Sequence, residues 1–415
     1  MNATTQNAIT QSISEVLKPA QICVNTQLPA RRGRDHRIDW LRGLALVSIF
    51  INHMPGNRFE NWTTRNFGFS DAAELFVLLA GVAAALAYFP RFSMGQRTIV
   101  GLKALRRAGV LYGAHLVSTL AAVAIFGSAA WLFDNGDVFE LIGISAVLAD
   151  PVQGVLAIAL GQQQLGYFNI LPLYVFLLLL VPGLLWLAVR DLRLMLAASG
   201  AVYLQAQLLP VEMQSFPTDG GWYFNPFAWQ LVYAIGLALG VLRVRGQTVP
   251  WHPAVGTLAA LYVMFAFVWM VGDMGGRVSL DLLPMWMDTL HKSMLPLSRL
   301  LHVLALAYLL VNSPLWVRMA RISSNNILTR MGRNSLPVFV FGSLLSMVGY
   351  LTLVNIGSLL WLEFALTAGG VALMWALASA IETGVFRRLR GSLALRARSA
   401  FALVHFTAKT PTARH

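Results

Sequence analysis

An arginine and a histidine share the first long apolar stretch of the chain, as Arg42 and His53. Their eleven-residue spacing is close to three full turns of an α-helix, so both side chains are predicted to point from nearly the same face. They would lie about 16 Å apart along the helix axis. Asp39, three residues before Arg42, can pair with the guanidinium. One helix face is therefore predicted to carry an ion pair at one end and an imidazole at the other.

The imidazole has the clearest chemistry, because its free pKa near neutrality lets it take a proton from an attacking hydroxyl. Covalent catalysis through the imidazole itself is a second route. We favour the direct route, since no second group that could carry a covalent intermediate is evident at that depth. A purely structural alternative also fits the spacing: Asp39 and Arg42 anchor the helix at the lipid headgroups, and His53 lies at the opposite interface.

Two carboxylates, Asp71 and Glu74, open the next apolar stretch on the side where the first one ends. Their spacing is that of a capping box, with Asp71 as the N-cap residue and Glu74 three positions on. Either carboxylate could also hold the tautomer of the His53 imidazole and stabilise its charged form. Glu74 is the deeper of the two, and one residue can serve both roles.

The elements that must position these groups are apolar and long. The 415 residues are 57% hydrophobic and only 12% charged, about half the charged share of a soluble domain. A bilayer core about 30 Å thick needs roughly 20 apolar residues per helix. We therefore predict an all-α, polytopic membrane protein of about ten spanning helices, at 38–54, 70–89, 99–127, 167–189, 193–209, 227–243, 253–272, 297–313, 335–356 and 359–383.

Basic residues cluster at alternate ends of these stretches, which is the positive-inside pattern. With both termini in the cytoplasm, all but five Lys and Arg residues lie on that side or at that end of a helix, and most acidic residues lie opposite. An odd number of spans would disrupt this separation. The five exceptions are Arg58, Arg65, Arg277, Lys292 and Arg299.

The remaining segments complete the predicted organisation. Residues 138–160 are apolar but interrupted by Glu140, Asp150 and Pro151, which predicts a re-entrant or interfacial segment. The rest divides into a disordered cytoplasmic segment (1–34), one membrane domain (35–390) and a basic cytoplasmic tail (391–415).

Several function classes find no support in the sequence. The net charge of +13 sits at helix ends, so it does not indicate a nucleic-acid partner. We find no metal-binding His-x-x-Glu-His or cysteine pair, no phosphate-binding loop and no Gly-x-Ser-x-Gly elbow. No metal and no permanently bound cofactor are therefore expected.

The Arg42-x10-His53 spacing resembles the signature of the acyltransferase-3 superfamily of membrane acyltransferases. Further stretches resemble OpgC-type succinyltransferases of osmoregulated periplasmic glucans, and the resemblance covers roughly residues 35–390. The stretches run from Asp39 to Leu46, Asn52 to Asn57, Gly68 to Phe76, Gly166 to Pro172, Asn225 to Gln230 and Gly332 to Val338.

This resemblance implies an acyltransferase of the bacterial inner membrane that moves a succinyl group from cytoplasmic succinyl-CoA to hydroxyls of a periplasmic glucan. His53 would be the general base. Arg42 and Asp39 would lie on the path of the donor, whose thin pantetheine arm can thread between helices while its phosphates stay at the cytoplasmic mouth. The sequence does not indicate an oligomeric state.

Other charged residues have both a structural and a binding interpretation. A cluster of Lys103, Arg106 and Arg107 and, more weakly, Arg333 can anchor helices or bind the CoA phosphates. Arg299 and His302 share a helix face at the predicted extracytoplasmic end. They can bind the glucan or the succinyl carboxylate, or form a buried contact that holds two helices together.

Two alternative functions remain open at this stage. One is an acetyltransferase acting on another polysaccharide of the cell envelope. The other is a secondary transporter without catalysis, which ten helices with a few intramembrane charges would also suit. Transporters often contain internal repeats, and none is evident here.

Overall fold

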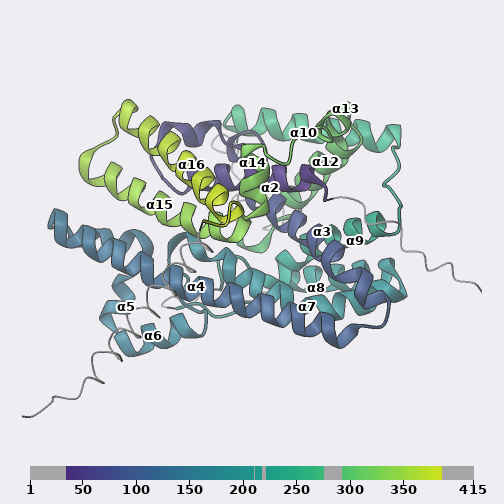
Figure 1. The fold of residues 1–415 in the computed structure, drawn as a ribbon, viewed down its shortest axis with the longest axis horizontal. Helices are drawn as coiled ribbons and strands as arrows, with labels where there is room; N and C mark the ends of the chain where they lie inside the picture. The colour runs from purple at the N-terminus through teal and green to yellow at the C-terminus, as the bar shows by residue number, and fades with distance from the viewer. Residues whose placement is uncertain (1–33, 210, 217–220, 275–291, 386–415) are drawn as a thin grey trace, which may run out of the picture. The chain divides into compact units, whose positions relative to one another are not determined.

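The computed structural model describes residues 34–209, 211–216, 221–274 and 292–385, and their regular elements are helices (Figure 1). The segment 391–415 and nearly all of 1–34, predicted to flank the membrane domain, lie outside the described residues. Each of the ten apolar stretches forms a helix. These are α2 (His36–Asn52), α3 (Ala72–Ser93), α4 (Arg97–Phe133), α7 (Ile170–Arg190), α8 (Leu192–Leu208), α9 (Pro226–Val244), α10 (Pro253–Val271), α12 (Leu297–Val311), α15 (Ser335–Ile356) and α16 (Leu360–Glu382).

In the described part of the chain, seven helices are long and apolar enough to cross a bilayer: α3, α4, α7 with the short η4 turn (Gly166–Phe168) before it, α9, α10, α15 and α16. The chain is thus an all-helical, polytopic membrane protein. The helices α2 and α8 have 17 residues each and α12 has 15. Ten spans, with both termini in the cytoplasm, therefore stay a prediction.

The interrupted stretch at 138–160 forms only short helices, η3 (Gly136–Ile142), α5 (Ser145–Ala149) and α6 (Pro151–Ala159). None is long enough to cross a bilayer. Other short elements are η1 (Arg58–Trp62), η2 (Thr64–Asn66), η6 (Lys292–Met294), α13 (Pro314–Met319) and α14 (Ile327–Arg333).

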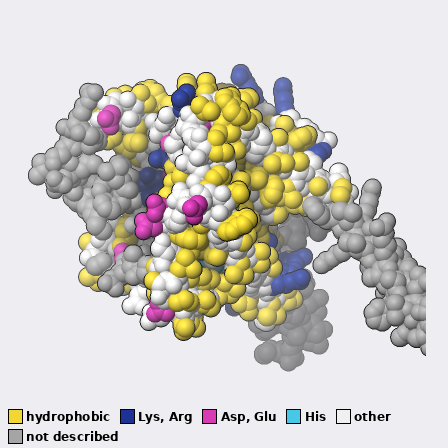
Figure 2. All heavy atoms as spheres, turned by 90° about the vertical axis from the view of Figure 1, so that its left-hand side faces the viewer, with side chains coloured by type: hydrophobic (Ala, Val, Ile, Leu, Met, Phe, Trp, Pro, Cys, Tyr) yellow, Lys and Arg dark blue, Asp and Glu magenta, His cyan; other side chains and the backbone are white. Residues whose placement is uncertain are grey.

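The outer surface fits a lipid environment. Hydrophobic side chains cover most of the face in Figure 2, with few charged groups among them. Only 11% of the apolar 18-residue segment of α10 is buried within the protein, and Leu258, Leu261 and Met264 are largely exposed. Apolar surface exposed to water costs about 25 cal/mol per Å². Such a helix is stable only where lipid or another apolar surface covers it.

Glycines set the closest helix contacts, as is common between membrane helices. The helices α3 and α9 pack side by side, and a Cβ on Gly81 would lie 2.1 Å from the Tyr233 carbonyl oxygen. Likewise, α14 packs on α2, where a Cβ on Gly332 would lie 1.7 Å from the Asp39 carbonyl oxygen. At both contacts the missing side chain of a glycine lets two helix backbones approach closely.

Candidate functional site

A cavity of about 210 Å³ lies between α2, α3, α4, α7, α9 and α15. Arg42 and Arg107, both predicted to bind the donor, line it from α2 and α4. Four alanines of α3 and the aromatic side chains of Tyr88, Tyr174 and Tyr233 line it as well. Because these residues include two arginines and no carboxylate, the cavity favours an anionic or hydrogen-bond-accepting ligand.

Aromatic contacts position Arg42 within this cavity. Its guanidinium carbon lies 5.9 Å from the ring centre of Phe76. Phe76 is itself held by Tyr174, which packs edge-on at 5.8 Å and donates a hydrogen bond of 3.0 Å to the Phe76 carbonyl oxygen. The side chains of Tyr174 and Tyr233 line the same cavity as the guanidinium. The charge therefore lies among polarisable rings and hydroxyl groups.

His53 is the first residue after α2, at the opposite end of that helix from Arg42. Its ring stacks on Tyr167 with 4.1 Å between centroids and 15° between planes. Its Nδ1 is buried and has no hydrogen-bond partner among the residues that the structure describes. The residues lining the cavity do not include His53. The arrangement fixes the plane of the imidazole and leaves its ring nitrogen available for a proton.

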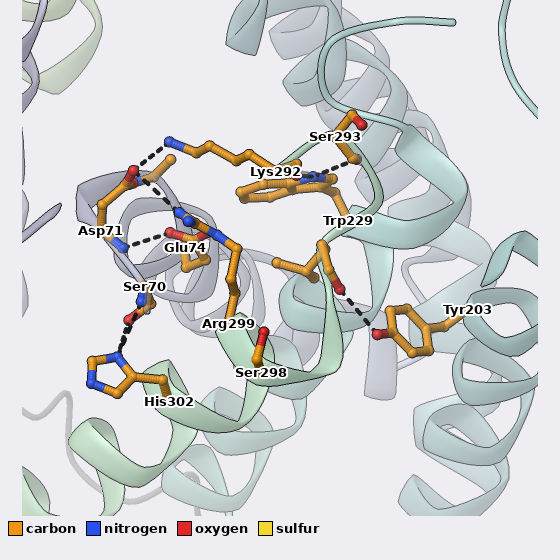
Figure 3. Close-up of polar contacts among 12 residues, drawn as sticks. Ser70, Asp71, Glu74, Tyr203, Trp229, Lys292, Ser293, Ser298, Arg299 and His302 are labelled. Atoms are coloured by element: carbon orange, nitrogen blue, oxygen red, sulfur yellow. Dashed lines mark hydrogen bonds and ion pairs between the residues drawn. The ribbon is translucent and has the colours of Figure 1, made fainter. Parts of the chain in front are cut away.

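A group of four charges, which we call the α3 charge cluster, lies at the start of α3 (Figure 3), where two of its members are buried and two are partly buried. It consists of Asp71, Glu74, Lys292 and Arg299. Asp71 Oδ2 pairs with Lys292 Nζ at 2.5 Å and with an Arg299 nitrogen at 3.2 Å. Arg299 Nε pairs with Glu74 Oε1 at 2.7 Å. Two cations and two carboxylates thus neutralise one another inside the protein.

Asp71 and Glu74 also form the predicted capping box. Asp71 accepts a hydrogen bond from the Ala73 amide at 2.8 Å, and Glu74 accepts one from the Asp71 amide at 2.9 Å. Burial by itself would raise the pKa of Asp71, but Lys292 and Arg299 hold it well below its usual range. Asp71, which precedes the spanning helix, is therefore ionised at physiological pH.

The carboxylates of the α3 charge cluster bond to its cations and to backbone amides rather than to His53. Within the described residues, neither carboxylate hydrogen-bonds to the imidazole, although the charges of Lys292 and Asp71 act on it. No contact therefore supports the prediction that Asp71 or Glu74 holds the tautomer of His53.

Arg299 and His302 both join α12 to the start of α3. Arg299 bonds to the two carboxylates, and His302 Nδ1 is hydrogen-bonded to the Ser70 amide (3.2 Å) and hydroxyl (2.7 Å). The buried contact between helices, one of the two interpretations weighed for this pair, is present, and binding of the glucan or the succinyl carboxylate by Arg299 and His302 stays a prediction.

The segment that carries Lys292 is fixed by side chains from α8 and α9. The Trp229 indole donates to the Ser293 carbonyl at 3.0 Å, and the Tyr203 hydroxyl donates to the Leu295 carbonyl at 3.0 Å. Asn225, at the start of α9, donates its amide N–H to the Ser293 carbonyl at 3.0 Å. The ammonium of Lys292 therefore reaches Asp71 from a well-anchored backbone.

The other residues predicted to bind the donor are dispersed. Arg333 pairs with Glu382 at 3.1 Å and donates to the Ser324 carbonyl at 2.7 Å, so it ties α14 to α16. Lys103, Arg106 and Arg107 are all exposed on α4, and only Arg107 of the three also lines the cavity. Asp39 is buried beside Gly332. The structure thus places Arg42 and Arg107 on the same cavity, whereas Arg333, two residues before the cavity-lining Ser335, pairs with Glu382 and is not among the lining residues.

Four residues of these sites were missed by sequence reasoning: Tyr167, Tyr174, Tyr233 and Lys292. Lys292 could have been noticed in the sequence, because it is one of the five Lys and Arg residues that depart from the positive-inside distribution. Four of those five pair with a carboxylate, and the fifth, Arg277, lies outside the described residues. The other two pairs are Arg58 with Glu363 at 3.8 Å and Arg65 with Glu60 at 3.6 Å.

The six stretches that carry the family resemblance meet around these sites. Gly166–Pro172 supplies Tyr167 and two cavity residues, and Gly332–Val338 supplies Ser335 and Leu336 of the cavity wall. Gly68–Phe76 supplies half of the α3 charge cluster, and Asn225–Gln230 holds its lysine segment. A sequence model of the family described as OpgC protein matches residues 34–384. No curated protein and no solved structure matches the chain.

Proposed function

Because the chain belongs to the OpgC protein family, we propose that it is a membrane O-acyltransferase that moves a succinyl group from cytoplasmic succinyl-CoA to hydroxyls of a periplasmic glucan. Family membership supports acyl transfer and a glucan acceptor. The identity of the donor and the role of each residue are our proposal.

The cavity is the observation that carries this proposal. It collects Arg42 and Arg107 without any carboxylate and is lined by the alanines of α3, which leave room for a thin chain. The pantetheine arm of an acyl-CoA is such a chain, and its phosphates would lie near Arg107, since arginine binds phosphate oxygens well. Arg42 lies in α2 and His53 directly follows its last residue, so a donor reaching from one to the other would run along this helix.

In the proposed reaction the donor thioester comes to lie beside His53. The imidazole takes the proton of a glucan hydroxyl while the hydroxyl oxygen attacks the thioester carbonyl carbon. The carbon–sulfur bond then breaks, and the CoA sulfur leaves and takes up the proton from the imidazolium. Stacking on Tyr167 holds the ring plane during both proton transfers. The α3 charge cluster supports the loop that follows His53 without entering the reaction.

The decisive variant is His53→Ala. Loss of a general base lowers rates by about 100- to 10,000-fold, so we expect succinylation of glucan by the purified protein to fall by at least that lower factor. Transfer of label from succinyl-CoA, with mass spectrometry of the glucan, measures this. The same spectra distinguish succinyl from acetyl esters, and labelled acetyl-CoA tests the acetyl alternative directly.

The matched control is His252→Ala, since His252 is exposed at the start of α10 and far in sequence from the site. This variant should transfer succinyl groups at the wild-type rate. Wild-type transfer by a folded His53→Ala protein would refute the assigned role. Uptake of free substrate without any covalent transfer by the wild-type protein would instead favour a transporter.

A further inference from the structure

Tyr233 of α9 combines burial, a cavity position and an unsatisfied hydroxyl. Its side chain is 1% exposed and lines the cavity that contains Arg42. Its hydroxyl is buried and has no hydrogen-bond partner within the described residues. Two other buried tyrosines differ, because Tyr174 donates to the Phe76 carbonyl and Tyr203 to the Leu295 carbonyl. A buried tyrosine hydroxyl normally finds a partner, so this exception needs an explanation.

Packing prevents Tyr233 from relieving this state by moving away. A Cβ on Gly81 would lie only 2.1 Å from the Tyr233 carbonyl oxygen, so α9 packs closely against α3 at this residue. A Cβ on Gly236, one turn later, would lie 2.1 Å from the Leu78 carbonyl oxygen. These two contacts fix the rotation of α9 about its axis and hold the Tyr233 ring against the cavity.

The surroundings of the hydroxyl determine which kind of partner fits. Arg42 and Tyr88 line the same cavity as Tyr233. A guanidinium has only hydrogen-bond donors, so Arg42 cannot accept the hydroxyl proton of Tyr233. No carboxylate lines the cavity to receive it. The missing partner is therefore an acceptor oxygen on a largely apolar molecule small enough to lie among the alanines of α3.

We propose that the Tyr233 hydroxyl donates a hydrogen bond to a carbonyl oxygen of the acyl-pantetheine arm and so positions the donor within the cavity. The proposal rests on the proposed function, since it takes the donor to be an acyl-CoA. The arm carries two amide carbonyls and a thioester carbonyl along an otherwise apolar chain. Tyr233 is thus a positioning residue for the donor, separate from the proton transfer at His53.

Tyr233→Phe tests this inference in the full-length purified protein. It removes a buried hydroxyl without a partner, so the thermal midpoint without ligand should be unchanged or higher. CoA should bind about 3- to 10-fold more weakly, the effect of losing one hydrogen bond. KM for succinyl-CoA should rise by a similar factor while kcat stays within about twofold.

The matched control is Tyr203→Phe, which removes a hydroxyl that donates to the Leu295 carbonyl and does not line the cavity. It should lower the thermal midpoint and leave CoA affinity unchanged. Fragments of the donor locate the contact. In Tyr233→Phe the affinity for phosphopantetheine should fall by the same factor as the affinity for CoA, and the affinity for adenosine 3′,5′-bisphosphate should be unchanged.

The results separate this inference from the proposed function. Wild-type affinity of Tyr233→Phe for CoA and phosphopantetheine, or a fall in its thermal midpoint like that of Tyr203→Phe, would overturn the role of Tyr233 while succinyl transfer by the wild-type protein still stood. Tyr233-dependent binding of phosphopantetheine by a protein that transfers no acyl group would support the role of Tyr233 and refute the proposed function.

Discussion

The cavity and the α3 charge cluster use the same kinds of side chain in opposite ways. Both lie along α3, which begins in the cluster at Asp71 and continues past the cavity from Phe76 to Tyr88. The cluster pairs two cations with two carboxylates at 2.5 to 3.2 Å. The cavity is lined by two arginines, three tyrosines and no carboxylate.

The difference indicates which charges pair with one another within the fold and which line a space that a ligand can enter. Charges that already pair with one another inside a protein have few hydrogen bonds free for a substrate. Removing one member of such a group leaves a buried charge unpaired. A cavity lined by cations without carboxylates has the opposite character, since it gains most when an anionic or acceptor-rich molecule enters. Variants in the two regions should therefore fail in different ways.

The largest expected effect is on stability, from Arg299→Met in the α3 charge cluster. It leaves Glu74 buried with one of its partners gone, and such losses cost about 3 to 5 kcal/mol. We expect a marked fall in the thermal midpoint in detergent, measured by a fluorescence melt. The double variant Arg299→Met with Glu74→Gln should recover part of that loss, because it removes the unpaired charge. If Arg299→Met alone were as stable as the wild type, the α3 charge cluster would not be what holds this part of the fold together.

The next effect is on donor binding, from Arg42→Met in the cavity. A charge-assisted hydrogen bond contributes about 1.5 to 3 kcal/mol, so CoA should bind about 10- to 100-fold more weakly. The thermal midpoint without ligand should change far less than in Arg299→Met. Titration calorimetry with CoA measures the first quantity. If Arg42→Met instead unfolds the protein and its folded fraction binds CoA normally, then Arg42 is a structural residue like Arg299.

The smallest effect is expected from Arg333→Met, which tests a donor-binding residue predicted from sequence. Its partner Glu382 is partly exposed, and ion pairs of that kind contribute about 1 kcal/mol or less. KM for succinyl-CoA should match the wild type within error, as steady-state kinetics can establish. A rise in KM comparable to that of Arg42→Met would show that the donor extends beyond the cavity to α14.

The sequence was informative where a local rule applies. The capping box of Asp71 and Glu74 depends on residues three apart, and it was predicted and is present. All ten apolar stretches are helical, because backbone groups in lipid must bond within their own segment. By contrast, Lys292 lies more than two hundred residues from Asp71, and no local pattern connects them. Only its place as an exception in the charge pattern marked it.

By itself the sequence determined that this chain is helical and membrane-embedded, and it predicted that Arg42 and His53 belong to the same apolar segment, where α2 carries Arg42 and ends one residue before His53. These properties follow from composition and from the 3.6-residue period. Only the tertiary structure decided that Arg107 and Tyr233 lie around the same cavity as Arg42, while Arg299 is taken up by two carboxylates. Helix packing at Gly81, Gly236 and Gly332 brings these side chains together, and such contacts between distant segments depend on the whole fold.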